Sequence, residues 1–346
     1  MNFIKPGTVL CLTALCCLGG GAAAAPLEKP GAVRNVVLVG WDGTQRARLT
    51  ELLAAGQLPN LKALVAEGSL AATQVTTGAT QTKPGWAEIL TGYSAPRLGI
   101  TRNRDYKPIP AGYTVFERLK KFFGPANIAT VFLSAKVNNL GARGPHEICE
   151  NCISRGSVHE KTRWWDKKSV TTSETKDGKP PVWVLREGEP YFNTVKSVDR
   201  YLTALGSAEN MDRKALAVLD KYRGKRFFAF FHFEEPDEQG HLYGESSKEY
   251  GEAIRTADRG LGEIVRKLKA LGLYRTTDIY VTTDHGMDEG GFEHSAAPDT
   301  FLATNSRRKL NNGDRKDITP TILDGYGIDL KGITPPLDGR SLFGGQ

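Results

Sequence analysis

The chain has 346 residues, of which 40% are hydrophobic and 25% are charged, and its formal net charge is +7. This composition predicts a soluble globular protein that buries a sizeable core, as one large α/β domain or two ordinary ones. The basic residues are spread along the chain without a dense run, which argues against specific nucleic-acid binding. A modest positive excess still favours small anionic substrates. The sequence does not indicate an oligomeric state.

The first 24 residues are expected to form a secretory signal peptide. Lys5 supplies a short positive region, residues 8–18 form an apolar run too short to span a membrane, and small residues suit cleavage after Ala24. We therefore expect a periplasmic or extracellular protein that has no membrane anchor once the signal peptide is removed.

Cleavage would leave only two cysteines, in the sequence Cys149-Glu-Asn-Cys152. In an oxidising compartment two such cysteines favour a short local disulfide. A zinc ribbon would need a second pair, and a redox pair would need a thioredoxin-like context.

The hydrophobic pattern over residues 25–346 alternates between strands and helices. This alternation predicts a three-layer αβα domain with a mostly parallel central sheet. Between residues 141 and 191 the pattern breaks down, and we expect an inserted cap there, pinned by the disulfide, that contributes to specificity. The predicted strands are 34–40, 128–134, 226–233 and 277–283, and the predicted helices are 46–67, 194–222 and 246–271.

Asp284 and His285 stand side by side where the predicted strand 277–283 ends. The carboxyl ends of strands in an open α/β sheet are where ligands usually bind. Mixed oxygen and nitrogen ligands suit Zn²⁺ better than Ca²⁺ or Mg²⁺.

Further acids and imidazoles follow the same pattern. Asp42 ends the first predicted strand, and Asp237 and His241 follow the strand 226–233 with a spacing of four, which brings side chains together on a helical turn. His294 lies on a glycine-rich loop. Each residue alone could be a helix cap, a turn former or a surface histidine. Six residues in this arrangement predict two cooperating metal ions.

Thr82 is a candidate nucleophile. Pro84 suits the first turn of a helix, so Thr82 would lie at a helix N-terminus, where free N–H groups favour an anion. Metal coordination can convert a threonine hydroxyl to a reactive alkoxide. The alternative is that Thr82 only caps the helix.

A set of short motifs, in this order along the chain, resembles the alkaline phosphatase superfamily and in particular its type I phosphodiesterase/nucleotide pyrophosphatase branch. The resemblance covers about residues 35–323, with the cap region outside it. The motifs are Gly40-Trp41-Asp42-Gly43, Thr82-Lys83-Pro84, Leu90-Thr91-Gly92, Pro236-Asp237-x-x-Gly240-His241, Thr283-Asp284-His285-Gly286, His294 and Asp317-Ile318-Thr319-Pro320-Thr321-Ile322-Leu323.

The resemblance implies two zinc ions, although other divalent ions such as Mn²⁺ are possible. Thr82 would attack phosphorus in a phosphodiester or nucleotide pyrophosphate and form a phospho-threonine intermediate, which water then hydrolyses. One ion would be held by Asp237, His241 and His294, and the other by Asp42, Asp284, His285 and the Thr82 oxygen.

Two further positions, Gly85 and Lys136, are candidates for a role in substrate binding. The branch commonly carries asparagine where this chain has Gly85, so a contact to a phosphoryl oxygen is absent or replaced there. Lys136 resembles the substrate-contacting lysine of sulfatases and some phosphomonoesterases, and its alternative role is that of a solvated loop lysine.

Three other functions stay open. A phosphomonoesterase could use the same metals. A sulfatase is disfavoured, because that class uses Cys or Ser followed by x-Pro-x-Arg, whereas Thr82 is followed by Lys-Pro-Gly-Trp. A catalytically inactive binding protein is disfavoured by the complete set of ligand residues.

Overall fold

The computed structural model describes Met1 and residues 34–137, 139–152, 175–176 and 178–344. The predicted signal peptide lies almost wholly outside the described residues, so its prediction stays open. Within the described part of the chain, no helix combines the length and apolar character needed to cross a membrane.

The core of the fold is an eight-stranded sheet with the strand order β10-β2-β9-β8-β1-β7-β3-β6. The five strands from β8 to β6 are parallel, whereas β9 is antiparallel to both of its neighbours, β2 and β8. The strands are β1 Asn35–Trp41, β2 Ser69–Gln74, β3 Ile128–Ser134, β4 His146–Cys149, β5 Trp183–Arg186, β6 Arg200–Leu202, β7 Arg226–Phe233, β8 Thr277–Thr282, β9 Asp299–Thr304 and β10 Gly313–Asp314.

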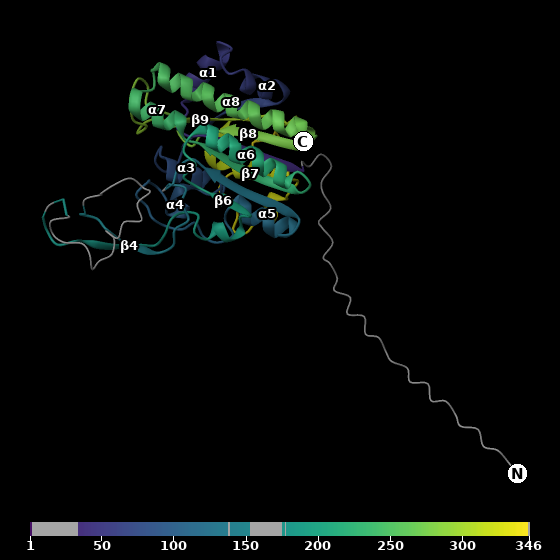
Figure 1. Ribbon diagram of the computed structural model, residues 1–346, viewed down its shortest axis with the longest axis horizontal. Coiled ribbons are helices and arrows are strands. Elements are labelled where there is room, and N and C mark those ends of the chain that lie inside the picture. Colours follow the sequence, from purple (N-terminus) through teal and green to yellow (C-terminus); the bar gives the residue numbers. More distant parts are fainter. Residues whose placement is uncertain (2–33, 138, 153–174, 177, 345–346) are drawn as a thin grey trace.

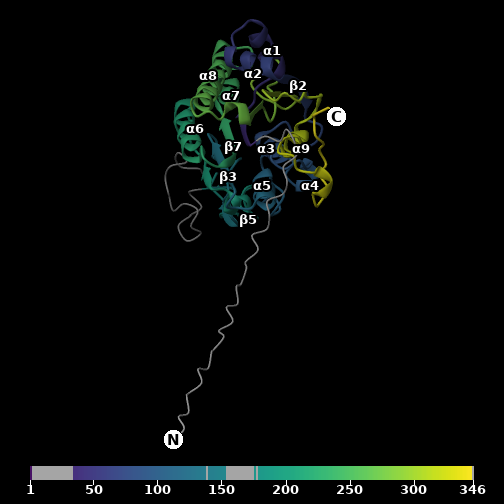
Figure 2. The ribbon, with the colours of Figure 1, turned by 90° about the vertical axis from the view of Figure 1, so that its right-hand side faces the viewer.

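Helices cover both faces of the sheet (Figures 1 and 2), which confirms the predicted three layers. Val37 and Val39 of β1 belong to a core with α1, α2, α6 and α8, and Val36 and Leu38 belong to a core with α3, α5 and α9. Successive strand residues point to opposite faces, and because both faces are covered by helices, every residue of β1 is buried. The helices are α1 Arg46–Ala54, α2 Pro59–Glu67, α3 Thr82–Ile89, α4 Ala95–Leu98, α5 Val115–Phe123, α6 Ala208–Tyr222, α7 Glu235–Tyr243, α8 Lys248–Ala270 and α9 Ile318–Gly325.

Two predicted helices are shorter in the structure than in the sequence pattern. The segment 46–67 divides into α1 and α2 because Gly56 adopts a left-handed conformation with φ of 71° and Pro59 starts a new helix. The segment 194–222 contains the edge strand β6 and becomes an α-helix only after Ser207, whose side chain caps α6.

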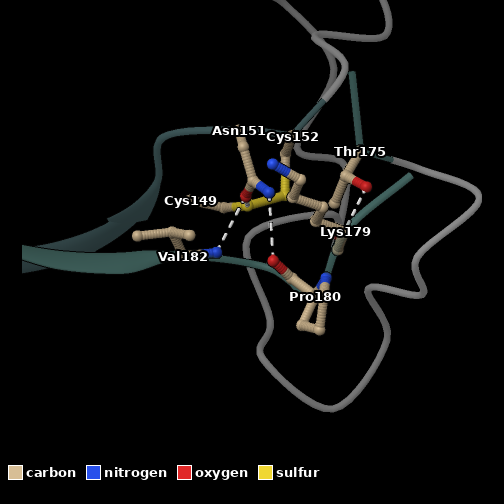
Figure 3. Close-up of a disulfide and its surroundings, with 7 residues drawn as sticks. All are labelled: Cys149, Asn151, Cys152, Thr175, Lys179, Pro180 and Val182. Atoms are coloured by element: carbon tan, nitrogen blue, oxygen red, sulfur yellow. Dashed lines mark hydrogen bonds between the residues drawn. A yellow bond between two sulfur atoms is a disulfide. The ribbon is translucent and has the colours of Figure 1, made fainter. Parts of the chain in front are cut away.

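The inserted region contains a two-stranded antiparallel sheet of β4 and β5. The predicted disulfide between Cys149 and Cys152 is present beside it (Figure 3). Asn151, between the two cysteines, connects this turn to the segment before β5. Its amide donates to the Pro180 carbonyl at 3.0 Å, and its side-chain oxygen accepts from the Val182 N–H at 2.8 Å. A role of this hairpin in specificity stays a prediction.

Candidate metal and catalytic site

The predicted ligands gather at one edge of the sheet because β1, β7 and β8 are adjacent, parallel and in register. Asp42 directly follows β1, and Asp284 and His285 follow β8. Asp237 lies in the first turn of α7, which follows β7. Four side chains that are far apart in the sequence thus meet at the carboxyl ends of three neighbouring strands.

The first group consists of Asp42, Asp284 and His285, all fully buried. His285 Nδ1 lies 2.8 Å from the Gly286 carbonyl oxygen, which can only accept, so Nδ1 carries the proton and Nε2 keeps its lone pair. That Nε2 lies 3.4 Å from Asp284 Oδ2 and 3.7 Å from Asp42 Oδ1. The three ligand atoms lie within 4.8 Å of one another, so they could hold one ion.

The second group forms around Asp237. His241 Nε2 lies 3.5 Å and His294 Nε2 lies 4.0 Å from Asp237 Oδ1. His241 Nδ1 donates to the Phe292 carbonyl at 2.7 Å, which again leaves Nε2 free for a ligand role. The ligand atoms of Asp237, His294 and His285 lie within 4.8 Å of one another. His285 therefore belongs to both groups, whereas His241 is not part of this compact set of three.

The residues present fit metal ions. Asp237 Oδ1, Asp284 Oδ2 and His285 Nε2 are buried and have no hydrogen-bond partner among the described residues. Unsatisfied buried polar atoms are costly, and here all three point into one cluster. Carboxylate oxygens and neutral imidazole nitrogens are the donors that zinc takes in proteins.

Lys136 lies at the centre of this cluster. Its Nζ donates to Asp42 Oδ1 at 2.8 Å, to Asp237 Oδ2 at 2.5 Å and to Thr82 Oγ1 at 3.2 Å. Burial by itself would lower the pKa of Lys136, but the Asp42 and Asp237 carboxylates raise that pKa above its ordinary value. The structure thus places Lys136 inside the site, as a cation that bridges two carboxylates and contacts the candidate nucleophile.

The pKa values of the candidate ligand residues shift in different directions. Burial raises the pKa of Asp284 well above its ordinary value, and the neighbouring Asp42 carboxylate raises it further. Burial would also raise the pKa of Asp42, but the Lys136 ammonium and a hydrogen bond with His232 outweigh it and lower that pKa. Burial, with nearby His285, lowers the pKa of His294 to about 4, so this imidazole is neutral at neutral pH.

Thr82 is the first residue of α3, and Gln81 rather than Thr82 occupies the cap position. Thr82 is buried next to Lys136. Asn103 holds the helix start from both sides: its side-chain oxygen accepts from Lys83 N–H and its own N–H donates to the Gln81 side chain, both at 2.8 Å. Thr82 is therefore held at the helix start without the capping hydrogen bond that the alternative role required.

Sequence reasoning missed two residues that orient Asp42. His232, buried in β7, has its Nε2 2.6 Å from Asp42 Oδ2, and the Trp86 indole N–H donates to the same oxygen at 3.3 Å. These contacts occupy Oδ2 and leave Oδ1 facing the site. The available signal was a single histidine within the otherwise apolar strand Arg226–Phe233, since a buried imidazole needs a polar partner.

Sequence reasoning also missed Arg315, which connects α3 with the segment that carries Asp284. This fully buried side chain donates to the Glu88 carboxylate at 2.5 Å and to the Asp284 carbonyl at 2.8 Å. It also donates to the Thr77 carbonyl at 3.0 Å, in the loop that leads to Thr82. A single guanidinium thus connects α3, the strand end of β8 and this loop.

Gly85 lies where α3 meets Asp284. A Cβ added at Gly85 would lie 2.6 Å from Asp284 Cβ and 3.1 Å from an Arg315 nitrogen. A glycine at this position is therefore required by the close packing of α3 on the metal-ligand segment. Whether the asparagine contact is absent or replaced at Gly85 stays a prediction, and a substrate contact by Gly85 itself would have to use the backbone.

Comparison with known proteins finds one matching family and several relatives. The profile of the type I phosphodiesterase/nucleotide pyrophosphatase family matches residues 36–334. A bis(5'-adenosyl)-triphosphatase ENPP4 from Pongo abelii is 24% identical over 260 residues, which is 74% of this chain and 48% of the relative. A venom phosphodiesterase from Crotalus durissus collilineatus is 40% identical over 78 residues, or 22% of this chain and 9% of the relative. The chain spans about half the length of the ENPP4 proteins that it matches.

Solved structures show the same fold. The alkaline phosphatase from the Antarctic bacterium TAB5 superposes with a TM-score of 0.52 at 13% identity, covering 86% of this chain and 99% of that one. Ps i-CgsB, in complex with k-i-k-neocarrahexaose, superposes with a TM-score of 0.57 at 16% identity, covering 90% of this chain and 75% of that one. At these identities the likeness concerns the fold alone.

Gly85→Ala should damage the site, because the added methyl group must push α3 away from Asp284. We expect a loss of about 1–3 kcal/mol in the free energy of unfolding, together with lower zinc content and activity. Gly224→Ala is the matched control, since a Cβ there meets nothing within 4 Å. Thermal unfolding and metal analysis check both variants, and a Gly85→Ala protein with normal stability and zinc would contradict the packing argument.

Proposed function

Because the chain belongs to the type I phosphodiesterase/nucleotide pyrophosphatase family, we propose that it hydrolyses phosphodiester or nucleotide pyrophosphate bonds with two zinc ions and a threonine nucleophile. One observation carries the proposal. Three buried ligand atoms, Asp237 Oδ1, Asp284 Oδ2 and His285 Nε2, have no hydrogen-bond partner among the described residues and belong to two groups that could each hold a metal ion.

Two ligand sets would hold the metals. Asp42, Asp284 and His285, with the Thr82 oxygen, would hold one ion, and Asp237, His241 and His294 the other. His285 lies close enough to both sets to keep them a short distance apart. Bound there, the ions would polarise phosphoryl oxygens and favour the deprotonated form of hydroxyl groups.

The residues of the chain supply the other requirements of the reaction. Thr82 Oγ1 would form a bond to phosphorus while the bond from phosphorus to the leaving oxygen breaks, and water would later cleave the phospho-threonine. The Lys136 ammonium, 3.2 Å from Oγ1, favours a negative charge on that oxygen. His232 and Trp86 keep Asp42 oriented, so the ligand group need not reorganise during turnover.

A phosphomonoesterase is the second candidate, and the placement of Lys136 favours it. A monoester carries one more negative charge than a diester, and a cation within the site could accept that charge. The alkaline phosphatase of bacterium TAB5 has the same fold.

We also propose that the protein is exported from the cytoplasm. The predicted leader over residues 1–24 and the disulfide between Cys149 and Cys152 both support an oxidising compartment outside the cytoplasm.

A substrate panel distinguishes these activities. We expect zinc-loaded protein to hydrolyse bis(4-nitrophenyl) phosphate and a dinucleoside polyphosphate faster than 4-nitrophenyl phosphate, with no turnover of 4-nitrophenyl sulfate. Faster turnover of the monoester would establish the second candidate instead. Turnover of the sulfate alone would refute both.

Thr82→Ala should abolish turnover while the protein remains folded. The change removes a buried hydroxyl that contacts Lys136, at a cost of about 1 kcal/mol in the free energy of unfolding. Asp42, Asp284 and His285 remain to hold the ion. Turnover should fall by several orders of magnitude, because the covalent step has lost its nucleophile.

Thr82→Ser is the matched control and should keep partial activity, because a primary hydroxyl can take the same position. Activity, zinc content and melting temperature are measured on one preparation of each variant. A stable, zinc-loaded and fully active Thr82→Ala protein would rule out the covalent mechanism.

A further inference from the structure

The inserted hairpin reaches the segment that flanks the candidate nucleophile. Arg186, the last residue of β5, places its guanidinium carbon 3.4 Å from the centroid of the Tyr106 ring. Lys83, the neighbour of Thr82, places its Nζ 3.7 Å from the centroid of the same ring. The Tyr106 ring thus contacts two cations, one from α3 and one from the hairpin of β4 and β5. Figure 1 shows this hairpin on the side of the molecule where α3 and α4 lie.

The segment that carries Tyr106 is fixed to the start of α3. Asn103 bonds to the residues on both sides of Thr82, and Lys83 Nζ donates to the Asp105 carbonyl at 3.0 Å. The Asp105 carboxylate in turn accepts from the Thr101 and Arg102 backbone at 2.7 and 2.9 Å, which closes the turn. Hydrogen bonds therefore fix the segment before Tyr106 relative to Thr82, and Arg186 stacks on the Tyr106 ring.

Among the residues that the structure describes, neither Lys83 nor Arg186 forms an ion pair. Burial and the Arg186 charge lower the pKa of Lys83 to about 8, and the Glu189 and Asp105 charges offset only part of this shift. Both acids also accept hydrogen bonds elsewhere, Asp105 from the backbone of its own turn and Glu189 from the Arg143 N–H at 2.6 Å. Lys83 is buried, whereas Arg186 is only half-buried, so Arg186 is the cation that a solute can contact.

We propose that Arg186, supported by Tyr106 and the charge of Lys83, forms a subsite for a second phosphate group of the substrate. The inference rests on the proposed function and narrows it to substrates with two or more linked phosphates, such as nucleotide pyrophosphates. A guanidinium that stacks on an aromatic ring keeps its edge N–H groups available, and their planar arrangement matches phosphate oxygens. The stacking also restricts the side chain, which lowers the entropic cost of binding.

Arg186→Gln tests this subsite with two substrates. We expect KM for a dinucleoside triphosphate to rise about tenfold with little change in kcat, because one charge-assisted contact to a non-reacting phosphate is lost. KM for bis(4-nitrophenyl) phosphate, which has a single phosphate, should change less than about twofold. Arg186→Lys should restore part of the difference. Added salt should weaken triphosphate binding to the original protein more than to Arg186→Gln.

Arg97→Gln is the matched control, because Arg97 also lies over a tyrosine, with its guanidinium carbon 4.6 Å from the Tyr93 ring centroid, but it is paired with Asp338 at 2.5 Å. It should leave the ratio of the two KM values unchanged. Tyr106→Leu, which removes the platform and keeps both cations, should reproduce much of the Arg186→Gln effect. Melting temperatures verify that the variants are folded.

Equal changes for both substrates, or no change for either, would overturn the subsite and leave the proposed function standing. If the original protein hydrolyses neither substrate, the proposed function itself falls. The two failures are thus distinguishable in one set of measurements.

Discussion

The site depends on the repulsion among three buried carboxylates. Asp42, Asp237 and Asp284 all lie at the carboxyl edge of the central sheet, where burial makes each negative charge costly. Lys136 offsets part of this charge through its bonds to Asp42 and Asp237. Burial, together with the Asp42 charge, raises the pKa of Asp284 well above its ordinary value. Divalent cations would supply the missing positive charge, and the oxygens of Asp237 and Asp284 that have no partner among the described residues would be their ligands.

The scaffold holds these charges together against their repulsion. Parallel pairing of β8, β1 and β7 fixes where each strand ends, and the side chains of these strands are buried on both faces of the sheet. Arg315 then ties the Asp284 backbone to α3 through Glu88, and Gly85 permits the close approach of that helix. Thr82, Asp42, Asp284 and His285 are therefore positioned by the fully buried elements α3, β1 and β8, which favours a preorganised site.

The sequence alone was sufficient for those parts of the fold that follow local rules. Apolar runs located β3 and β7 to the residue, and acids at strand ends located the ligand groups, because parallel strands bring their carboxyl ends together. The sequence alone did not predict the features that depend on tertiary contacts. The helical pattern over 194–222 hid the edge strand β6, which exists only through pairing with β3. His232, Arg315 and the stack of Lys83, Tyr106 and Arg186 act through partners up to 238 residues away, which no local pattern reveals.

We propose that this carboxylate and imidazole cluster is a two-metal site. Crystals grown with zinc and measured with anomalous scattering at the zinc edge would locate the ions. We expect two anomalous peaks, one among Asp42, Asp284 and His285 and the other among Asp237, His241 and His294, with the Lys136 ammonium displaced from the carboxylates. A cluster without zinc, with Lys136 still bridging Asp42 and Asp237 at saturating metal, would contradict it.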